Sequence, residues 1–314
     1  MSKASSRSQK PSSDPDVGRT SAPVVLLMND ALTSALREFR RMVKRCRSQG
    51  DVQSIHRLRI QSRRMVVWCD LLHSLDAGSG THEARRCIKK LLRALARVRD
   101  AQVQRELLKK VPRRWAAAAG ILIRELRRKE PRWARRVGER CRRVHPAEVA
   151  ALLTGEQRAW NRLRLAEGAD GLEEAVWRWL MTLEAEAQRR FRAVRATHPE
   201  SLHRFRIAVK YLRYGLEEVS TCLPDVSRES LLRLQRLQAR LGTIQDLDVC
   251  QHRLADVIAG DPAQADSLEP LRRWVLGRRD GAIKLLLRRP RAILPPASRL
   301  RRTGRSVGRR PPAS

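Results

Sequence analysis

A row of basic side chains runs along residues 201–219, which read SLHRFRIAVKYLRYGLEEV. An α-helix turns by about 100° per residue, so His203, Arg206, Lys210 and Arg213 project within about 80° of one another. The apolar residues of this segment occupy the adjacent sector and must be buried. Cations that flank a buried face line a groove between helices, whereas cations that only keep a helix soluble lie opposite the core. Long side chains that extend over the core edge into water are the alternative explanation.

The same pattern occurs in the first half of the chain, about 147 positions earlier. There the segment IHRLRIQSRRMVVWCDLL places His56, Arg59 and Arg63 at the positions of His203, Arg206 and Lys210. A second pair of segments, LARVRDAQV and LGTIQDLDV, aligns at nearly the same offset and matches Asp100 with Asp246. Two segments that share one offset indicate an internal repeat. We expect the two aspartates to orient nearby guanidinium groups rather than to bind a metal ion.

Further cations recur on the third helix predicted in each half. The first half offers Arg86, Lys90, Arg93 and Arg97, and the second offers Arg233, Arg236 and Arg240. The first set lies opposite the apolar residues of its helix and so has the geometry of a solvated face. These residues can contact phosphate only if the helices turn that face toward a shared cleft.

The overall charge predicts a polyanionic partner. Lys and Arg total 67 against 33 Asp and Glu, which gives a formal net charge of +34. Nucleic acid, an anionic membrane surface and inorganic phosphate chains all fit this charge. The six cysteines show neither zinc-site spacing nor a disulfide framework, and no apolar run is long enough to span a membrane or to form a secretion signal. We therefore expect a cytoplasmic protein without metal or cofactor.

The spacing of apolar residues by three and four predicts an all-α protein. Two tandem four-helix bundles related by the repeat, with a basic central cleft, are the expected architecture. The expected divisions are a disordered N-terminal arm (1–25), a first bundle (26–164), a second bundle (165–294) and a basic disordered tail (295–314). The boundary is placed at the stretch AEGADG (166–171), between helices predicted at 147–164 and 171–197.

The paired motifs IHRLRIQSRR and LHRFRIAVKYLRY, with RVRDAQV and IQDLDV downstream, resemble those of the conserved histidine α-helical domain (CHAD) family. The resemblance covers roughly residues 26–290 and implies two four-helix bundles whose basic central cleft binds inorganic polyphosphate, in some cases on polyphosphate granules. It implies no catalysis by this domain. Tyr211 departs from the family pattern, in which an Arg is often found. Carried over by position, the implied phosphate contacts are His56, Arg59, Arg63, Arg64, His203, Arg206, Lys210 and Arg213. Lys90, Arg93, Arg97, Arg236 and Arg240 complete the candidate set.

Two other functions remain open at this point. A nucleic-acid-binding protein would use the same charge, although the few aromatic residues argue against single-strand stacking. A phosphate-transferring enzyme would need clustered carboxylates to hold Mg²⁺, and Asp246 and Asp248 diverge in direction on one helix. The two histidines either contact the ligand or fix a helix pair by a hydrogen bond.

Overall fold

A computed structural model describes residues 24–48, 51–75, 79–155, 158–223, 225–288, 294 and 300. These residues form nine α-helices and two 3-10 helices, with no β-strand among them, so the all-α prediction is confirmed. The α-helices are α1 (Val24–Ser48), α2 (Val52–Leu75), α3 (Ser79–Lys109), α4 (Ala116–Arg142), α5 (Pro146–Gly155), α6 (Arg158–Arg192), α7 (Pro199–Val219), α8 (Arg228–Gly260) and α9 (Ala265–Leu287). The 3-10 helices are η1 (Arg113–Trp115) and η2 (Pro262–Gln264).

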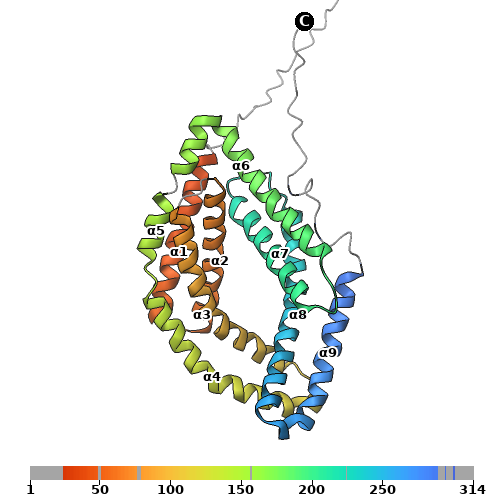
Figure 1. Cartoon of the computed structure of the whole chain (residues 1–314). Helices are drawn as coiled ribbons and strands as arrows, with labels where there is room; N and C mark the ends of the chain where they lie inside the picture. The colour runs from red at the N-terminus through yellow and green to blue at the C-terminus, as the bar shows by residue number, and fades with distance from the viewer. Residues whose placement is uncertain are drawn as a thin grey trace, which may run out of the picture.

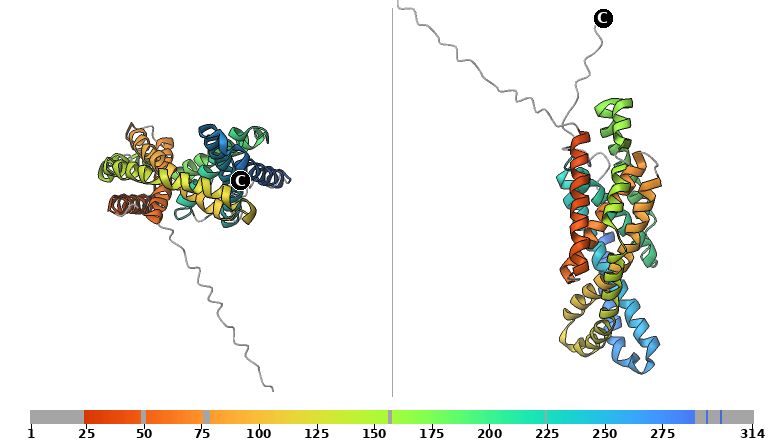
Figure 2. Two further views of the ribbon diagram at one scale, coloured as in Figure 1. Left: turned by 90° about the horizontal axis from the view of Figure 1, so that it is seen from below. Right: turned by 90° about the vertical axis from the view of Figure 1, so that its left-hand side faces the viewer.

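The helices form two groups that are joined above and below. Figure 1 shows α1, α2, α3 and α5 on one side and α7, α8 and α9 on the other, with α6 passing over the upper end. At the lower end α4 crosses toward α8 and α9, which it contacts, and the view from below shows the same crossing (Figure 2). The two groups also meet directly, because α2 packs on α7 and α3 packs on α8.

Both hydrophobic clusters contain residues from both predicted halves. The larger cluster joins residues of α1, α2 and α3 with residues of α6, α7 and α8, and includes Phe39, Trp68 and Phe205. The smaller one fills the lower end, where α3 and α4 meet α8 and α9 around Leu122 and Leu254. The division into two tandem bundles therefore stays a prediction.

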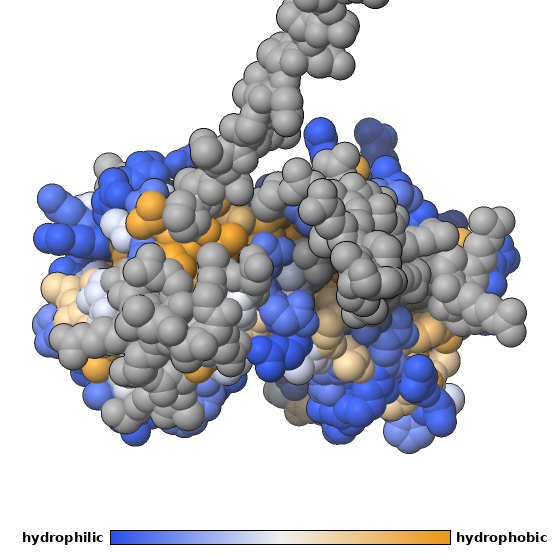
Figure 3. Space-filling model, turned by 90° about the horizontal axis from the view of Figure 1, so that it is seen from above, coloured by the Kyte–Doolittle hydropathy of each residue, from blue (hydrophilic) through white to orange (hydrophobic). Residues whose placement is uncertain are grey.

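Figure 3 shows that hydrophilic side chains cover much of the face seen from above.

One predicted helix break is wrong. The stretch AEGADG lies inside α6, a continuous helix of 35 residues, whereas α5 ends at Gly155. A helical glycine costs roughly 1 kcal/mol relative to alanine. The packing of α6 against α1, α2 and α7 is sufficient to offset two of them.

The ends of the chain were predicted to be unpacked. Val24 and Val25 already belong to α1, and Val25 is buried. Leu300 is fully buried and its carbonyl oxygen accepts a hydrogen bond from Ser227 N at 2.9 Å, so the prediction is wrong at this residue. The other residues of 1–23 and 295–314 lie outside the described part of the chain.

A close approach of two helices fixes α7 in place. Gly215 of α7 lies against α6, where an added Cβ atom would come within 2.9 Å of Leu183 Cδ1 and 3.1 Å of Trp179 CH2. A larger residue at this position would require the side chains of Leu183 and Trp179 to shift, so glycine lets them pack directly on α7. At its start α7 has Pro199 in the first turn, a position that suits the fixed backbone angle of proline.

Candidate functional site

Four cations from both halves of the chain meet where α2 packs on α7. Arg59 and Arg63 come from α2, and Arg206 and Lys210 come from α7; we call these four residues the central cluster. Each residue flanks fully buried neighbours, such as Leu58 on α2. The helical spacing that placed them beside the core therefore also brings the matched positions of the repeat together.

A pocket of about 310 Å³ opens between α2, α3 and α7 beside the central cluster. Arg59, Arg63 and Lys210 line it, and α3 adds Lys89 and Arg93. The remaining lining is apolar or aromatic: Val66, Val67, Leu92, Ala96, Ile207, Tyr211 and Tyr214. The pocket is thus a basic recess with an apolar floor.

Burial and mutual repulsion disfavour the charged forms of the central cluster. The pKa of Lys210 lies well below its ordinary value because the amine is buried and because Arg63, Arg206 and Arg59 surround it. The same two causes lower the pKa of Arg206 and bring that of Arg59 to about 10. Cations gathered without full compensation destabilise a fold, so this cluster is a candidate for a functional site.

Two carboxylates border the cluster without neutralising it. Arg59 NH2 lies 3.8 Å from Asp100 Oδ1, which agrees with the expected orienting role of this aspartate. Burial raises the pKa of Asp246 to about 6, although Arg206 acts in the opposite direction. Arg206 Nε is buried and has no hydrogen-bond partner among the described residues. The cluster therefore contains at least one donor that is unsatisfied within the described residues.

The two histidines lie in different surroundings. His203 is exposed, and its Nδ1 donates a hydrogen bond to Gln245 Oε1 at 2.5 Å, which links α7 to α8. This bond matches the helix-fixing alternative. His56 is half-buried, and burial together with Arg99, Arg63 and Arg59 lowers its pKa. In the free protein this imidazole is thus more readily neutral than an ordinary histidine.

Arg64 and Arg213 are held by carboxylates of the protein itself. Arg64 pairs with the buried Glu218 of α7, which also accepts a hydrogen bond from Trp68 Nε1 at 2.9 Å. Arg213 donates to Glu217 and to Gln238 Oε1, at 2.8 Å in the second case. Because each arginine is already paired with a carboxylate, we leave both out of the candidate site.

The cations predicted on the third helices separate into three environments. Arg93 lines the pocket at the central cluster. Lys90 and Arg97 lie with Arg93 in a second pocket of about 410 Å³, which opens between α3 and α4. In the second half, Arg236 and Arg240 are exposed and line none of the pockets described here.

Three of the polar or aromatic lining residues were not predicted as phosphate contacts. Lys89 follows the buried Ile88 and lines a different pocket from Lys90, since adjacent residues project about 100° apart; the pair of lysines was the available signal. Tyr214 and Tyr211 lie on the α7 face beside Lys210. Their hydroxyl groups have the capacity to donate hydrogen bonds to an anion.

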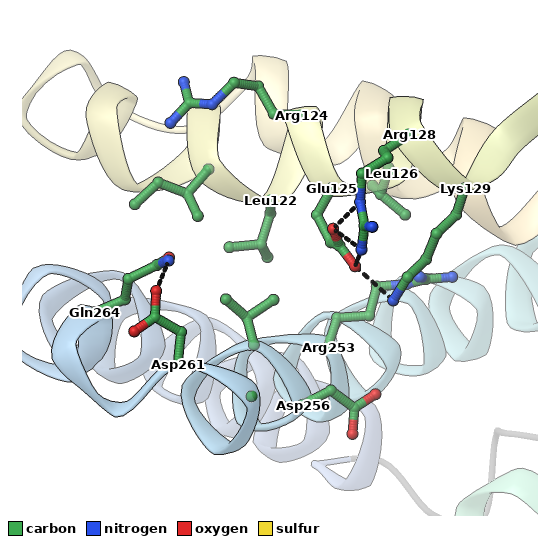
Figure 4. A pocket seen from close by; sticks show the side chains of 13 residues that line it. Leu122, Arg124, Glu125, Leu126, Arg128, Lys129, Arg253, Asp256, Asp261 and Gln264 are labelled. Carbon is green, nitrogen blue, oxygen red and sulfur yellow. Dashed lines mark hydrogen bonds and ion pairs between the residues drawn. The ribbon is translucent and has the colours of Figure 1, made fainter.

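A larger pocket of about 650 Å³ has a different character. It lies between α4 and the end of α8, and its cations are Arg124, Arg128, Lys129 and Arg253. Glu125 pairs with Lys129 at 2.5 Å and with Arg128 at 3.0 Å, as the dashed lines in Figure 4 indicate. Asp256 and Asp261 also line this pocket. Its charges largely compensate one another, unlike those of the central cluster.

The described residues contain no group of three His, Cys, Asp or Glu side chains placed to hold a metal ion. No helix within them combines the length and the apolar character needed to cross a membrane.

Comparison with known proteins identifies the family. The model of the CHAD domain matches residues 30–255. Among solved structures, the chain is similar to the crystal structure of the CHAD domain from the plant Ricinus communis, with a TM-score of 0.63 and 18% identity over 87% of this chain and 91% of that chain. At this identity the likeness concerns the fold alone. No curated protein matches the sequence. The family match extends over most of the chain and includes both halves of the central cluster, so this protein belongs to the CHAD domain family.

Proposed function

We propose that the protein binds inorganic polyphosphate without catalysis, and that the central cluster is the principal contact. The observation that carries this proposal is the set of four cations, drawn from α2 and α7, that the neighbouring carboxylates do not neutralise. Polyphosphate carries about one negative charge per internal phosphate, and its oxygens accept the hydrogen bonds that guanidinium groups donate. Membership of the CHAD family supports the same ligand.

Shape and chemistry of the pocket agree with this ligand. A recess of about 310 Å³ accommodates a few phosphate groups but no folded partner. Arg206 does not line this recess, but its buried Nε lacks a partner among the described residues and its charge acts on Lys210, which does line it. A bound anion would also favour the charged form of Lys210, whose pKa is lowered in the free protein. Localisation to the cytoplasm and to polyphosphate granules belongs to the same proposal.

The decisive test compares two double variants that lose the same charge. Arg206→Ala with Lys210→Ala is expected to weaken polyphosphate binding at least about tenfold, because each charge-assisted hydrogen bond contributes about 1.5–3 kcal/mol. Arg204→Ala with Arg233→Ala removes two cations that pair with Glu200 and Glu229 on their own helices, and should leave binding nearly unchanged. Titration calorimetry at several salt concentrations measures both.

The outcome separates this proposal from its alternatives. Equal losses in the two variants would mean that net charge alone attracts the ligand. Displacement of polyphosphate by short duplex DNA at equal charge concentration would favour a nucleic-acid-binding protein. Release of orthophosphate in the presence of Mg²⁺, abolished by Asp246→Ala, would contradict the absence of catalysis.

A further inference from the structure

A second basic surface lies on the face of α3 next to the one that borders the central cluster. Arg86, Lys90, Arg93 and Arg97 of α3 line two adjoining pockets of about 410 and 190 Å³ together with Arg136 and Arg140 of α4 and Arg143 at its C-cap. We call these seven residues and the space between them the α3/α4 groove. The two pockets share Lys90, Arg140 and Arg143, so they form one continuous depression.

The cations of the groove have little counter-charge nearby. Some exposed arginines on other helices pair with a carboxylate one turn away, as Arg41 does with Glu38 and Arg189 with Glu186. Others, such as Arg37 and Arg40, form no ion pair with a described residue. None of the seven cations of the groove forms an ion pair or a side-chain hydrogen bond with a residue that the structure describes. The only carboxylates that line it are Glu139 and Glu83.

The arrangement of the cations is linear. On α3 they follow one another by four, three and four residues and extend over about 16 Å of helix. On α4 they follow by four and three residues and extend over about 10 Å. Two rows of this kind along neighbouring helices suit an extended anion that carries charge at regular intervals. A single phosphate group would engage only two or three of them.

Arg93 connects the groove to the central cluster. It lines both the pocket between α2, α3 and α7 and the pocket between α3 and α4. The residues beside it on the two sides of α3 are small, Ala94 in the groove and Ala96 in the central pocket. Arg93 is therefore the residue at which a chain bound at the central cluster would pass to the groove.

We propose that the α3/α4 groove binds the continuation of a polyphosphate chain whose other part occupies the central cluster. This inference rests on the proposed function and adds to it a dependence on chain length. Tripolyphosphate fills only the central pocket, whereas a long chain reaches both surfaces. The second half has no equivalent among the described residues, because Arg233 pairs with Glu229 and neither Arg236 nor Arg240 lines a pocket described here. The bound chain therefore continues beyond the central cluster only on the side of the first half, along α3 and α4.

The test uses the full chain, two probes and two sets of substitutions. The groove variant carries Arg136→Gln, Arg140→Gln and Arg143→Gln. For long-chain polyphosphate, the slope of log K against log salt concentration should become smaller in magnitude by about 2 to 3. In DNA binding, each phosphate contact contributes nearly one to this slope. Its affinity for tripolyphosphate should not change. The variant Arg206→Ala, Lys210→Ala should weaken the binding of both probes. Calorimetry at four salt concentrations yields all of these values.

A matched control separates local from general effects. Arg41→Gln, Arg189→Gln, Arg272→Gln removes three exposed cations that pair with glutamates on their own helices, and should leave both salt dependences unchanged. If the groove and control variants lose equal affinity for long chains, or if the groove variant binds long chains like the wild type, the proposed binding at the groove is wrong. Tripolyphosphate binding unaffected by the central variant would instead overturn the proposed function. Should the α4 substitutions reduce helicity, Lys90→Gln with Arg97→Gln tests the same groove from α3.

Discussion

Two regions of the same helix pair, α2 and α7, differ in how the positive charge is compensated by carboxylates. At one, Arg64 is paired with the buried Glu218, and Trp68 completes the hydrogen bonding of the carboxylate. At the other, the central cluster gathers four cations, and Arg59 has its nearest carboxylate oxygen 3.8 Å away. Both regions are built from the same two helices, so the difference lies in the charges placed opposite each arginine.

The comparison indicates which cations stabilise the fold and which serve a ligand. A buried ion pair is costly to break, because removal of one partner leaves the other uncompensated. Cations without a nearby carboxylate lower the stability of the fold unless an anion binds to them. We therefore assign the Arg64 and Glu218 pair to the framework and propose the central cluster for binding. Three changes test this distinction.

Removal of the paired carboxylate should have the largest effect on stability. Glu218→Gln leaves the partly buried Arg64 without a counter-charge and weakens the bond from Trp68, so the free energy of unfolding should fall by about 2–3 kcal/mol. Polyphosphate affinity of the folded variant should be unchanged. Urea denaturation followed by circular dichroism measures the first quantity. An unchanged unfolding free energy would remove the distinction between the two regions.

Removal of the unpaired cation Lys210 should raise the free energy of unfolding instead of lowering it. Lys210→Met replaces a buried amine, surrounded by three arginines, with an apolar side chain of similar length. We expect the free energy of unfolding without ligand to rise by about 1 kcal/mol, since repulsion and the cost of burial both disappear. Affinity for polyphosphate should fall several-fold at the same time. Thermal denaturation with and without polyphosphate checks both, and a destabilised variant would indicate that Lys210 is structural.

The smallest effect concerns pH. Asp246 has a raised pKa of about 6, so it loses its charge as the pH falls through that value; His56, whose pKa is lowered, gains charge at still more acidic pH. Both changes make the site more positive. Affinity for polyphosphate should therefore rise roughly threefold as the pH falls from 7 to 5.5, with proton uptake on binding. Asp246→Asn should bind more tightly at pH 7 and show a weaker pH dependence; an unaltered dependence would exclude Asp246 as its source.

Helical periodicity was sufficient to predict most of the framework. The spacing of apolar residues predicted the all-α fold, and it placed Arg59, Arg63, Arg206 and Lys210 beside the core, where the structure has them. It could not predict which residue lies opposite each cation, because that depends on how the helices pack. Arg64 faces the buried Glu218 for this reason, although on the sequence it resembles its neighbours.

The same limit applies to α3 and to α6. Every helix has several faces, and the sequence alone does not show which of them meets α2 and which meets α4. Lys90 and Arg97 consequently line the α3/α4 groove, while Lys89 lines the central pocket. The glycines of AEGADG predicted a break on local propensity, but tertiary packing of α6 outweighed it.

The contact at Gly215 has a consequence for selectivity. Because Leu183 and Trp179 of α6 pack directly on Gly215, α7 is held on α6 while it carries Arg206 and Lys210 beside α2. A ligand fits such a recess best if it can rotate about its own bonds. Single phosphoanhydride chains have that freedom. Duplex DNA, with a persistence length of about 50 nm, has too little of it to enter a recess of about 310 Å³.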